Sequence, residues 1–141
     1  MYGTIVLALD GSEGSSRALP HAVELAKASN GRIVVAHVDE RIVAKGDMPP
    51  ATPGAEAAKE RVAAQVEEIK GAGVDASLQT SVIVLGGPGQ AIAEIAAEVG
   101  ADLIVVGTRG HSSVPGLVLG SVAHRLLHVA HRPVLAVPPP A

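Results

Sequence analysis

Short aliphatic segments that alternate with segments of helical spacing constrain the fold of this chain more than any other feature. Four of them are aliphatic runs rich in β-branched residues: 4–9, 32–38, 103–106 and 133–137. A fifth, 77–85, alternates polar and apolar residues more than the others. Unbroken runs are typical of parallel strands covered on both faces, because neither face of such a strand meets water.

Between these runs, apolar residues recur at the spacing of helices, over 19–26, 62–69, 92–99 and 122–129. The resulting alternation of strand and helix, beginning and ending with a strand, predicts an open α/β sheet built from right-handed crossovers. A length of 141 residues suits one domain, 1–141, with no room for two of full size.

Capping and helix-breaking residues indicate where the helices begin and end. Ser12 and Ser15 are candidate N-caps of the first helix, and Pro20 should kink that helix or displace its start. Gly71 and Gly73 close the second helix, while Pro88 can open the third from its first turn.

The longest stretch without predicted structure covers residues 39–54 and contains Pro49, Pro50 and Pro53. A loop of this length in a small domain is usually functional or mobile. One hypothesis is a lid over a ligand; the alternative is a disordered insertion without a role.

The composition excludes several classes of function. Tyr2 is the single aromatic residue, which argues against modules that stack nucleic-acid bases on aromatic side chains. A formal charge of −3 gives no broad basic surface for nucleic acid or for an anionic membrane. The absence of cysteine excludes disulfides, thiolate metal sites and cysteine nucleophiles.

No apolar run approaches the roughly 20 residues that span a bilayer. The first residues also lack the charged region and cleavage site of a signal peptide. A cytoplasmic protein with no nucleic-acid or membrane partner is therefore expected.

The segments 105–110 and 120–124 form the candidate chemical site. A glycine-rich loop there joins the end of a buried strand to the start of a helix. Open α/β sheets bind ligands beyond the carboxyl ends of their strands, and a helix N-terminus favours phosphate. The alternative is that the glycines only shape a long turn and that Ser121 only caps its helix.

The spacing Gly107-x2-Gly110-x9-Gly120-Ser121 matches the G-x2-G-x9-G-[ST] pattern of the nucleotide-binding branch of the universal stress protein family. Residues 5–12 (IVLALDGS), 36–38 and 132–137 resemble other segments of that family, so the resemblance covers essentially the whole chain. It implies a Rossmann-like, five-stranded parallel sheet of order 3-2-1-4-5, with helices on both faces, that binds ATP.

The resemblance also implies roles for individual residues near the nucleoside. Ala8 and Asp10 would border the adenosine, the backbone of Val38 would hold the adenine edge, and Gly107 would lie against the ribose. Asp10 has an alternative role as a turn residue that accepts hydrogen bonds from nearby amides.

On the phosphate side, the resemblance implies a cradle formed by Gly110, Gly120, Ser121 and Val122. The nearest basic side chains that would offset the charge belong to Arg109 and His111. This segment contains no lysine, so backbone amides and a helix terminus would have to bind the phosphates. Adenine would rest on aliphatic walls near Ala8 and Val38.

The sequence carries no G-x4-G-K-[ST] phosphate loop and no G-x-G-x2-G after its first strand. It also shows no convincing base for activating a water beside the γ-phosphate. We therefore expect an ATP-binding regulatory or sensing module with little or no catalysis, its Mg²⁺ carried by the nucleotide. Two alternatives are a slow ATPase or adenylyl-transfer enzyme on the same scaffold and an interaction protein with a vacant loop.

Histidines invite two further hypotheses. His124, His128 and His131 lie at i, i+4 and i+7 of the predicted last helix, and we expect them to face solvent rather than bind a metal. His37 is expected to be a hydrogen-bonded core residue rather than a catalytic base.

The charged residues between 56 and 70 are interpreted as a solvated helix face.

The last strand, 134–137, is expected at an edge of the sheet, and exposed aliphatic edges pair with other chains. In the family that the chain resembles, this strand pairs with its equivalent across a two-fold axis. Both considerations predict a homodimer.

Overall fold

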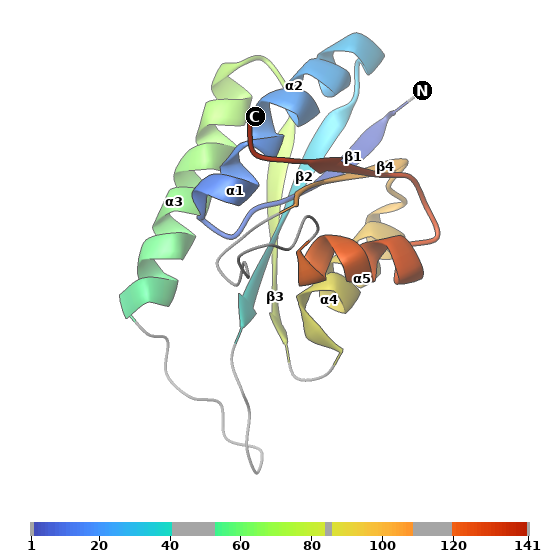
Figure 1. The fold of residues 1–141 in the computed structure, drawn as a ribbon. Helices are drawn as coiled ribbons and strands as arrows, with labels where there is room; N and C mark the ends of the chain where they lie inside the picture. The colour runs from blue at the N-terminus through green and yellow to red at the C-terminus, as the bar shows by residue number, and fades with distance from the viewer. Residues whose placement is uncertain (1, 41–52, 84–85, 109–119, 141) are drawn as a thin grey trace.

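In the computed structural model, which describes residues 2–40, 53–83, 86–108 and 120–140, parallel strands form one sheet (Figure 1). Their order is β3-β2-β1-β4-β5, which confirms the predicted Rossmann-like topology. The bounds are Thr4–Ala8 for β1, Arg32–Glu40 for β2, Ala76–Ile83 for β3, Leu103–Gly107 for β4 and Val134–Val137 for β5.

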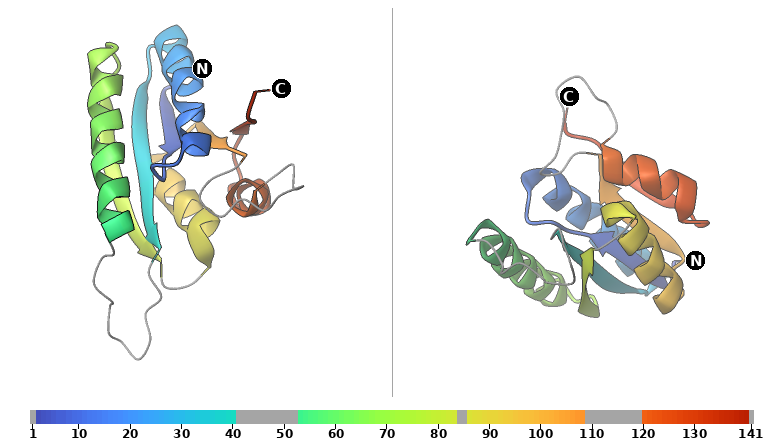
Figure 2. Two further views of the ribbon diagram at one scale, coloured as in Figure 1. Left: turned by 60° about the vertical axis from the view of Figure 1, so that its left-hand side comes forward. Right: turned by 90° about the horizontal axis from the view of Figure 1, so that it is seen from below.

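Helices cover both faces of this sheet, as predicted (Figure 2). Their bounds are Glu13–Ser16 for α1, Ala18–Ser29 for α2, Pro53–Gly71 for α3, Gly87–Val99 for α4 and Ser121–Val129 for α5. The cores show that α2 and α3 pack on one face and α4 and α5 on the other.

Alternation along the strands sends side chains into two separate cores. In β1, Ile5 and Leu7 pack with α2 and α3, while Val6 and Ala8 pack with α4 and α5. All four are buried, which explains why β1 is an unbroken apolar run. Burial of aliphatic side chains on both faces is the main stabilising contribution to such a sheet.

The predicted first helix is two helices. Ser12 is the N-cap of α1, as predicted, but Ser15 lies inside α1 and caps neither helix. The helix is interrupted at Arg17 and α2 starts at Ala18, which places Pro20 in the first turn of α2. A first-turn proline leaves no intrahelical bond unmade, so Pro20 displaces the helix start and is tolerated there.

Two predicted boundaries are wrong. Strand β2 continues through Asp39 to Glu40 and α3 already begins at Pro53, so the predicted loop 39–54 is too long at both ends; residues 41–52 lie outside the described residues. His131 does not belong to the last helix: α5 ends at Val129, and His131 has a left-handed φ of 52°.

The strand order determines where a ligand site can form. From β1 the chain adds β2 and β3 on one side, and then crosses to add β4 and β5 on the other. The carboxyl ends of β1 and β4 therefore flank the switch point, where open α/β sheets bind ligands. Within the described ranges, no helix is both long and apolar enough to cross a membrane.

Candidate nucleotide site

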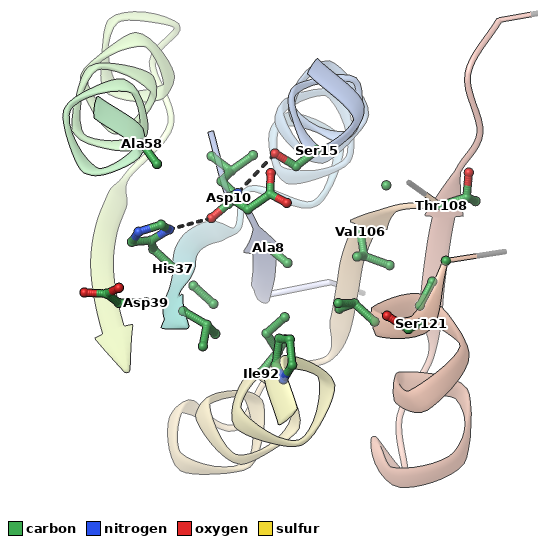
Figure 3. A pocket seen from close by; sticks show the side chains of 18 of the residues that line it. Ala8, Asp10, Ser15, His37, Asp39, Ala58, Ile92, Val106, Thr108 and Ser121 are labelled. Atoms are coloured by element: carbon green, nitrogen blue, oxygen red, sulfur yellow. Dashed lines mark hydrogen bonds between the residues drawn. The ribbon is translucent and has the colours of Figure 1, made fainter. Parts of the chain in front are cut away.

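A cavity of about 350 Å³ opens at this switch point, at the carboxyl edge of the sheet (Figure 3). Its walls come from segments far apart in the sequence: the ends of β1, β2 and β4, and the first turns of α3, α4 and α5. The lining is mostly aliphatic and small, including Ala8, Ala36, Val38, Ala58, Ile92 and Val106. A flat apolar ring system is the kind of group that such walls accommodate.

The cavity brings together most of the residues predicted for the site. The lining residues among them are Ala8, Asp10, Val38, Gly107, Gly120, Ser121 and Val122. Arg109, Gly110 and His111 lie outside the described residues. Residues separated by more than 110 positions, such as Ala8 and Ser121, thus share one cavity.

A closed set of hydrogen bonds shapes the turn after β1. The Asp10 Oδ1 atom accepts a bond from the Ser12 amide (2.8 Å) and another from the Ser12 hydroxyl. The Asp10 amide in turn donates to Ser15 Oγ (3.1 Å). These bonds confirm that Asp10 is a turn residue, and its position on the cavity leaves the ligand role a prediction.

Gly11 lets this turn approach helix α3. Its φ of 82° is left-handed, and an added Cβ would lie 3.0 Å from the Ala58 Cα atom. Both the conformation and the close approach therefore favour glycine. The contact holds the first turns of α3 against the cavity.

His37 ties the end of β2 to the end of β1. The side chain is buried, with 4% of its surface exposed, and its Nδ1 atom donates to the Leu9 carbonyl at 3.0 Å. A carbonyl only accepts, so Nδ1 carries the proton. The Leu9 amide also donates to the Ala36 carbonyl (3.0 Å), so Leu9 is bonded to β2 through both backbone groups. The prediction of a hydrogen-bonded core histidine is confirmed.

The start of α5 differs, because no side chain among the described residues caps it. The N-cap is Gly120, with an extended backbone (φ −70°, ψ 164°), so the interpretation of Ser121 as the cap is wrong. The first intrahelical bond runs from the His124 amide to the Gly120 carbonyl (3.0 Å). The amides of Ser121, Val122 and Ala123 precede it, and all three residues line the cavity. Such amides and the helix dipole together favour an anion.

The model of the universal stress protein family matches residues 1–138. This chain belongs to the universal stress protein family. Among similar curated proteins, the universal stress protein YxiE of Bacillus subtilis is 31% identical, over 97% of this chain and 99% of its own length. The resemblance seen in the sequence is thereby confirmed, and the chain is a member of a family of stress-response proteins.

Solved structures of this family share the fold. A universal stress protein crystallised in complex with cAMP is 33% identical, with a TM-score of 0.73 and coverage of 96% of this chain and 97% of that one. The universal stress protein from Archaeoglobus fulgidus in complex with dAMP is 28% identical, with a TM-score of 0.73 and the same coverages.

For this universal stress protein, the structure adds lining residues that sequence reasoning missed. Asp39 and Thr108 are buried polar residues at the carboxyl ends of β2 and β4, while Pro88 and Ile92 come from α4. The signal for the first two was present, because carboxyl ends of parallel strands meet at one edge. For the two residues of α4 the sequence holds no such signal, because only the packing of α4 shows which of its residues reach the cavity.

The histidines near the C-terminus of this family member lie apart from the cavity. His124, His128 and His131 are all exposed, as predicted, and the His128 Nδ1 atom bonds to the His124 carbonyl at 3.0 Å. In the described part of the chain, no group of three or more histidine, aspartate or glutamate side chains is placed to hold a metal ion. The charged side chains between 56 and 70 are exposed, as predicted for a solvated face of α3.

Proposed function

We propose that this chain binds ATP in the cavity at the switch point and acts as a nucleotide-dependent regulatory or sensing module in the stress response. The observation that carries the proposal is the N-terminus of α5, which opens onto an aliphatic cavity and has no side-chain cap from residues 2–40, 53–83, 86–108 or 120–140. A chain with a net charge of −3 gains affinity for a polyanion most directly from such amides. The similar structures with cAMP and dAMP support an adenine nucleotide as the ligand.

In this proposal the two sides of the cavity hold different parts of the nucleotide. Adenine lies between aliphatic walls that include Ala8 and Val38, with its edge bonded to the Val38 backbone and the ribose against Gly107. The phosphates lie at the start of α5, near Ser121 and Val122. Mg²⁺ arrives with the triphosphate, since phosphate oxygens and water usually supply most of its ligands.

Little or no catalysis is proposed, because structural hydrogen bonds already engage polar side chains on the cavity. The Ser15 hydroxyl accepts from the Asp10 amide, Asp10 Oδ1 accepts from Ser12, and the His37 Nδ1 atom donates to Leu9. These contacts support a role of the three side chains in shaping the cavity. With Nδ1 of His37 protonated, the lone pair of its imidazole lies on Nε2, and a phosphate-release assay tests whether that atom acts as a base.

Calorimetric titration with ATP, ADP, AMP and cAMP tests the binding proposal, using the wild type, Gly120→Val and the matched exposed variant Gly71→Val. Valine adopts the extended backbone of Gly120 readily, so a loss of binding would come from its side chain at the start of α5. We expect the wild type and Gly71→Val to bind nucleotide alike. In Gly120→Val the affinity should be at least about tenfold lower, which corresponds to the loss of one charge-assisted hydrogen bond.

Absence of binding by the wild type to all four nucleotides would refute the proposal. A phosphate-release assay on the same proteins tests the expected lack of turnover. Turnover well above background that one polar substitution abolishes would instead favour a slow ATPase or adenylyl-transfer enzyme.

We also propose a homodimer that forms through β5. This strand is at the end of the sheet order, and Leu135 within it is 36% exposed. Unpaired aliphatic edge strands add further strands readily. Light scattering at micromolar concentration should report a dimer for the wild type and a monomer for Leu135→Glu, because a charge on an edge opposes pairing. A wild type that stays monomeric would contradict this proposal.

A further inference from the structure

We propose that Gly89 sets the position of the phosphate-binding amides by fixing how closely helix α5 approaches helix α4. This inference rests on the proposed function and deepens it, because it concerns the phosphate half of the same site. It assigns a positioning role to a residue that does not line the cavity. The role is exerted through the contact between the two helices.

The contact at Gly89 leaves no space for a side chain. A Cβ atom at this position would lie 2.7 Å from the Arg125 Cβ atom, 2.8 Å from the Arg125 Cγ atom and 3.2 Å from the Val122 carbonyl oxygen. The Arg125 Cβ atom and the Val122 carbonyl oxygen are fixed by the backbone of α5, so a rotamer change of Arg125 can move its Cγ atom but not these two. A larger residue at position 89 therefore has to push α5 away from α4.

The same contact lies next to the cavity. Gly89 is the third residue of α4 and follows Pro88, which lines the cavity. Across the contact, Val122 is the second residue of α5 and also lines the cavity. Figure 3 shows the two helices side by side below it, with Ile92 on α4 and Ser121 on α5.

The backbone itself does not require glycine at position 89. Gly89 is buried within a helix and its φ is not left-handed, in contrast to Gly86 and Gly87. At such a position alanine is intrinsically preferred, because glycine loses more conformational entropy on folding. The close approach of α5 is therefore the feature that glycine permits here.

A displacement of α5 would act selectively on the phosphates. The amides of Ser121 and Val122 move with the helix, and hydrogen bonds weaken steeply as distance and angle depart from their optimum. The backbones of Ala8 and Val38 are held by strand pairing, with Ala36 and Ser81 respectively, and Asp10 is held by the hydrogen bonds of the turn before α1. Binding of the nucleoside should therefore be kept while the added affinity of each phosphate is lost.

The test is calorimetric titration of Gly89→Ala with adenosine, AMP, ADP and ATP. We expect a dissociation constant for adenosine within about twofold of the wild type, and one for ATP at least about tenfold higher, as for a lost bond to a charged group. Gly71→Ala is the matched control, because a Cβ at this exposed helix end meets nothing within 4 Å. It should bind all four ligands as the wild type does.

A compensating substitution separates positioning from general damage. Arg125→Gly removes both of the nearest atoms, so Gly89→Ala with Arg125→Gly should regain the phosphate-dependent affinity of Arg125→Gly alone. If Gly89→Ala does not fold by circular dichroism, the double variant carries the test against Arg125→Gly. A double variant that folds yet shows weaker ATP binding than Arg125→Gly would overturn the inference.

The remaining outcomes distinguish this inference from the proposed function. If the wild type binds no adenine nucleotide, the proposed function fails and the inference fails with it. If the wild type binds ATP and Gly89→Ala binds it equally well, or loses adenosine and ATP affinity alike, the inference alone is wrong.

Discussion

Two helices begin on the rim of the same cavity, and both begin near a Gly-Ser pair. At α1 the pair is Gly11-Ser12 and the serine is the N-cap, with φ −80° and ψ 161°. At α5 the pair is Gly120-Ser121 and the glycine is the N-cap, with φ −70° and ψ 164°. The two N-cap backbones are thus nearly the same, and the pair is shifted by one residue relative to the helix start.

Because of this one-residue shift, a side chain caps the start of α1, which we call closed, and the N-cap residue of α5 has no side chain, so we call that start open. At α1 the Ser12 hydroxyl oxygen accepts a bond from the Ser15 amide (3.1 Å), so the chain satisfies its own donor. At α5 the N-cap has no side chain that could do the same. An anion in the cavity thus competes with an internal cap at α1 and with water at α5. The difference explains why the proposed phosphate site lies at α5.

The largest effect is expected from closing the open start with Gly120→Asp. Aspartate suits the extended backbone at this position, caps the helix and places a negative charge where the phosphates are proposed to lie. We expect the affinity for ATP to fall more than about tenfold, while the free protein gains a few tenths of a kcal/mol. Calorimetry and urea denaturation measure the two changes.

The control for that variant is Gly71→Asp, which makes the same change at the exposed end of α3. Unchanged ATP affinity in Gly120→Asp would show that the start of α5 is not the phosphate site.

A smaller effect on stability is expected from opening the closed start with Ser12→Ala. The variant loses the cap bond from the Ser15 amide and the one bond from the Ser12 hydroxyl to Asp10 Oδ1. We expect the free energy of unfolding to fall by about 1 kcal/mol, measured by urea denaturation.

Ser121→Ala is the matched comparison, because this serine is exposed and follows its N-cap. Its free energy of unfolding should change by less than about 0.5 kcal/mol, as for exposed substitutions. Equal losses in Ser12→Ala and Ser121→Ala would refute the distinction between the two helix starts.

The smallest effect is expected at Thr108, which joins β4 to the open start. Its carbonyl accepts a bond from the Gly120 amide (2.5 Å), but its hydroxyl, in a side chain 6% exposed, has no partner within the described residues. Replacing an unsatisfied buried hydroxyl by a methyl group of similar shape is neutral or stabilising. Thr108→Val should therefore change the free energy of unfolding by between zero and about +1 kcal/mol in urea.

Thr108→Ser keeps the hydroxyl and loses the methyl group, so it should be less stable than Thr108→Val. A clear loss of stability in Thr108→Val would show that the hydroxyl makes a bond that stabilises the folded chain.

Residue patterns predicted most of the fold because strands buried on both faces are unmistakably apolar. The resemblance to the universal stress protein family, not the apolar runs, predicted the site residues, and seven of them line the cavity. Local capping was less predictable, because Ser12 and Ser121 sit in similar pairs yet only one is an N-cap. The choice depends on where tertiary packing starts each helix.

Contacts between helices were beyond the reach of sequence reasoning for the same reason. Gly89 looks like any residue of a helix start, and only the approach of Arg125 to within 2.7 Å of a Cβ placed there reveals the constraint. The lining role of Ile92 likewise follows from how α4 lies on the sheet.

The strand order has one more consequence, for the folding of the chain. β1 pairs directly with β4, as in the partners Ile5 and Leu103, so the cavity forms only after segments about a hundred residues apart have met. Pairings of such long range slow folding, because the loop they close costs entropy before the contact repays it. A ligand that binds only the finished cavity then stabilises the whole domain in proportion to the logarithm of its concentration. If the proposed nucleotide binds this chain, its cellular level would therefore also set how much of the protein survives thermal stress.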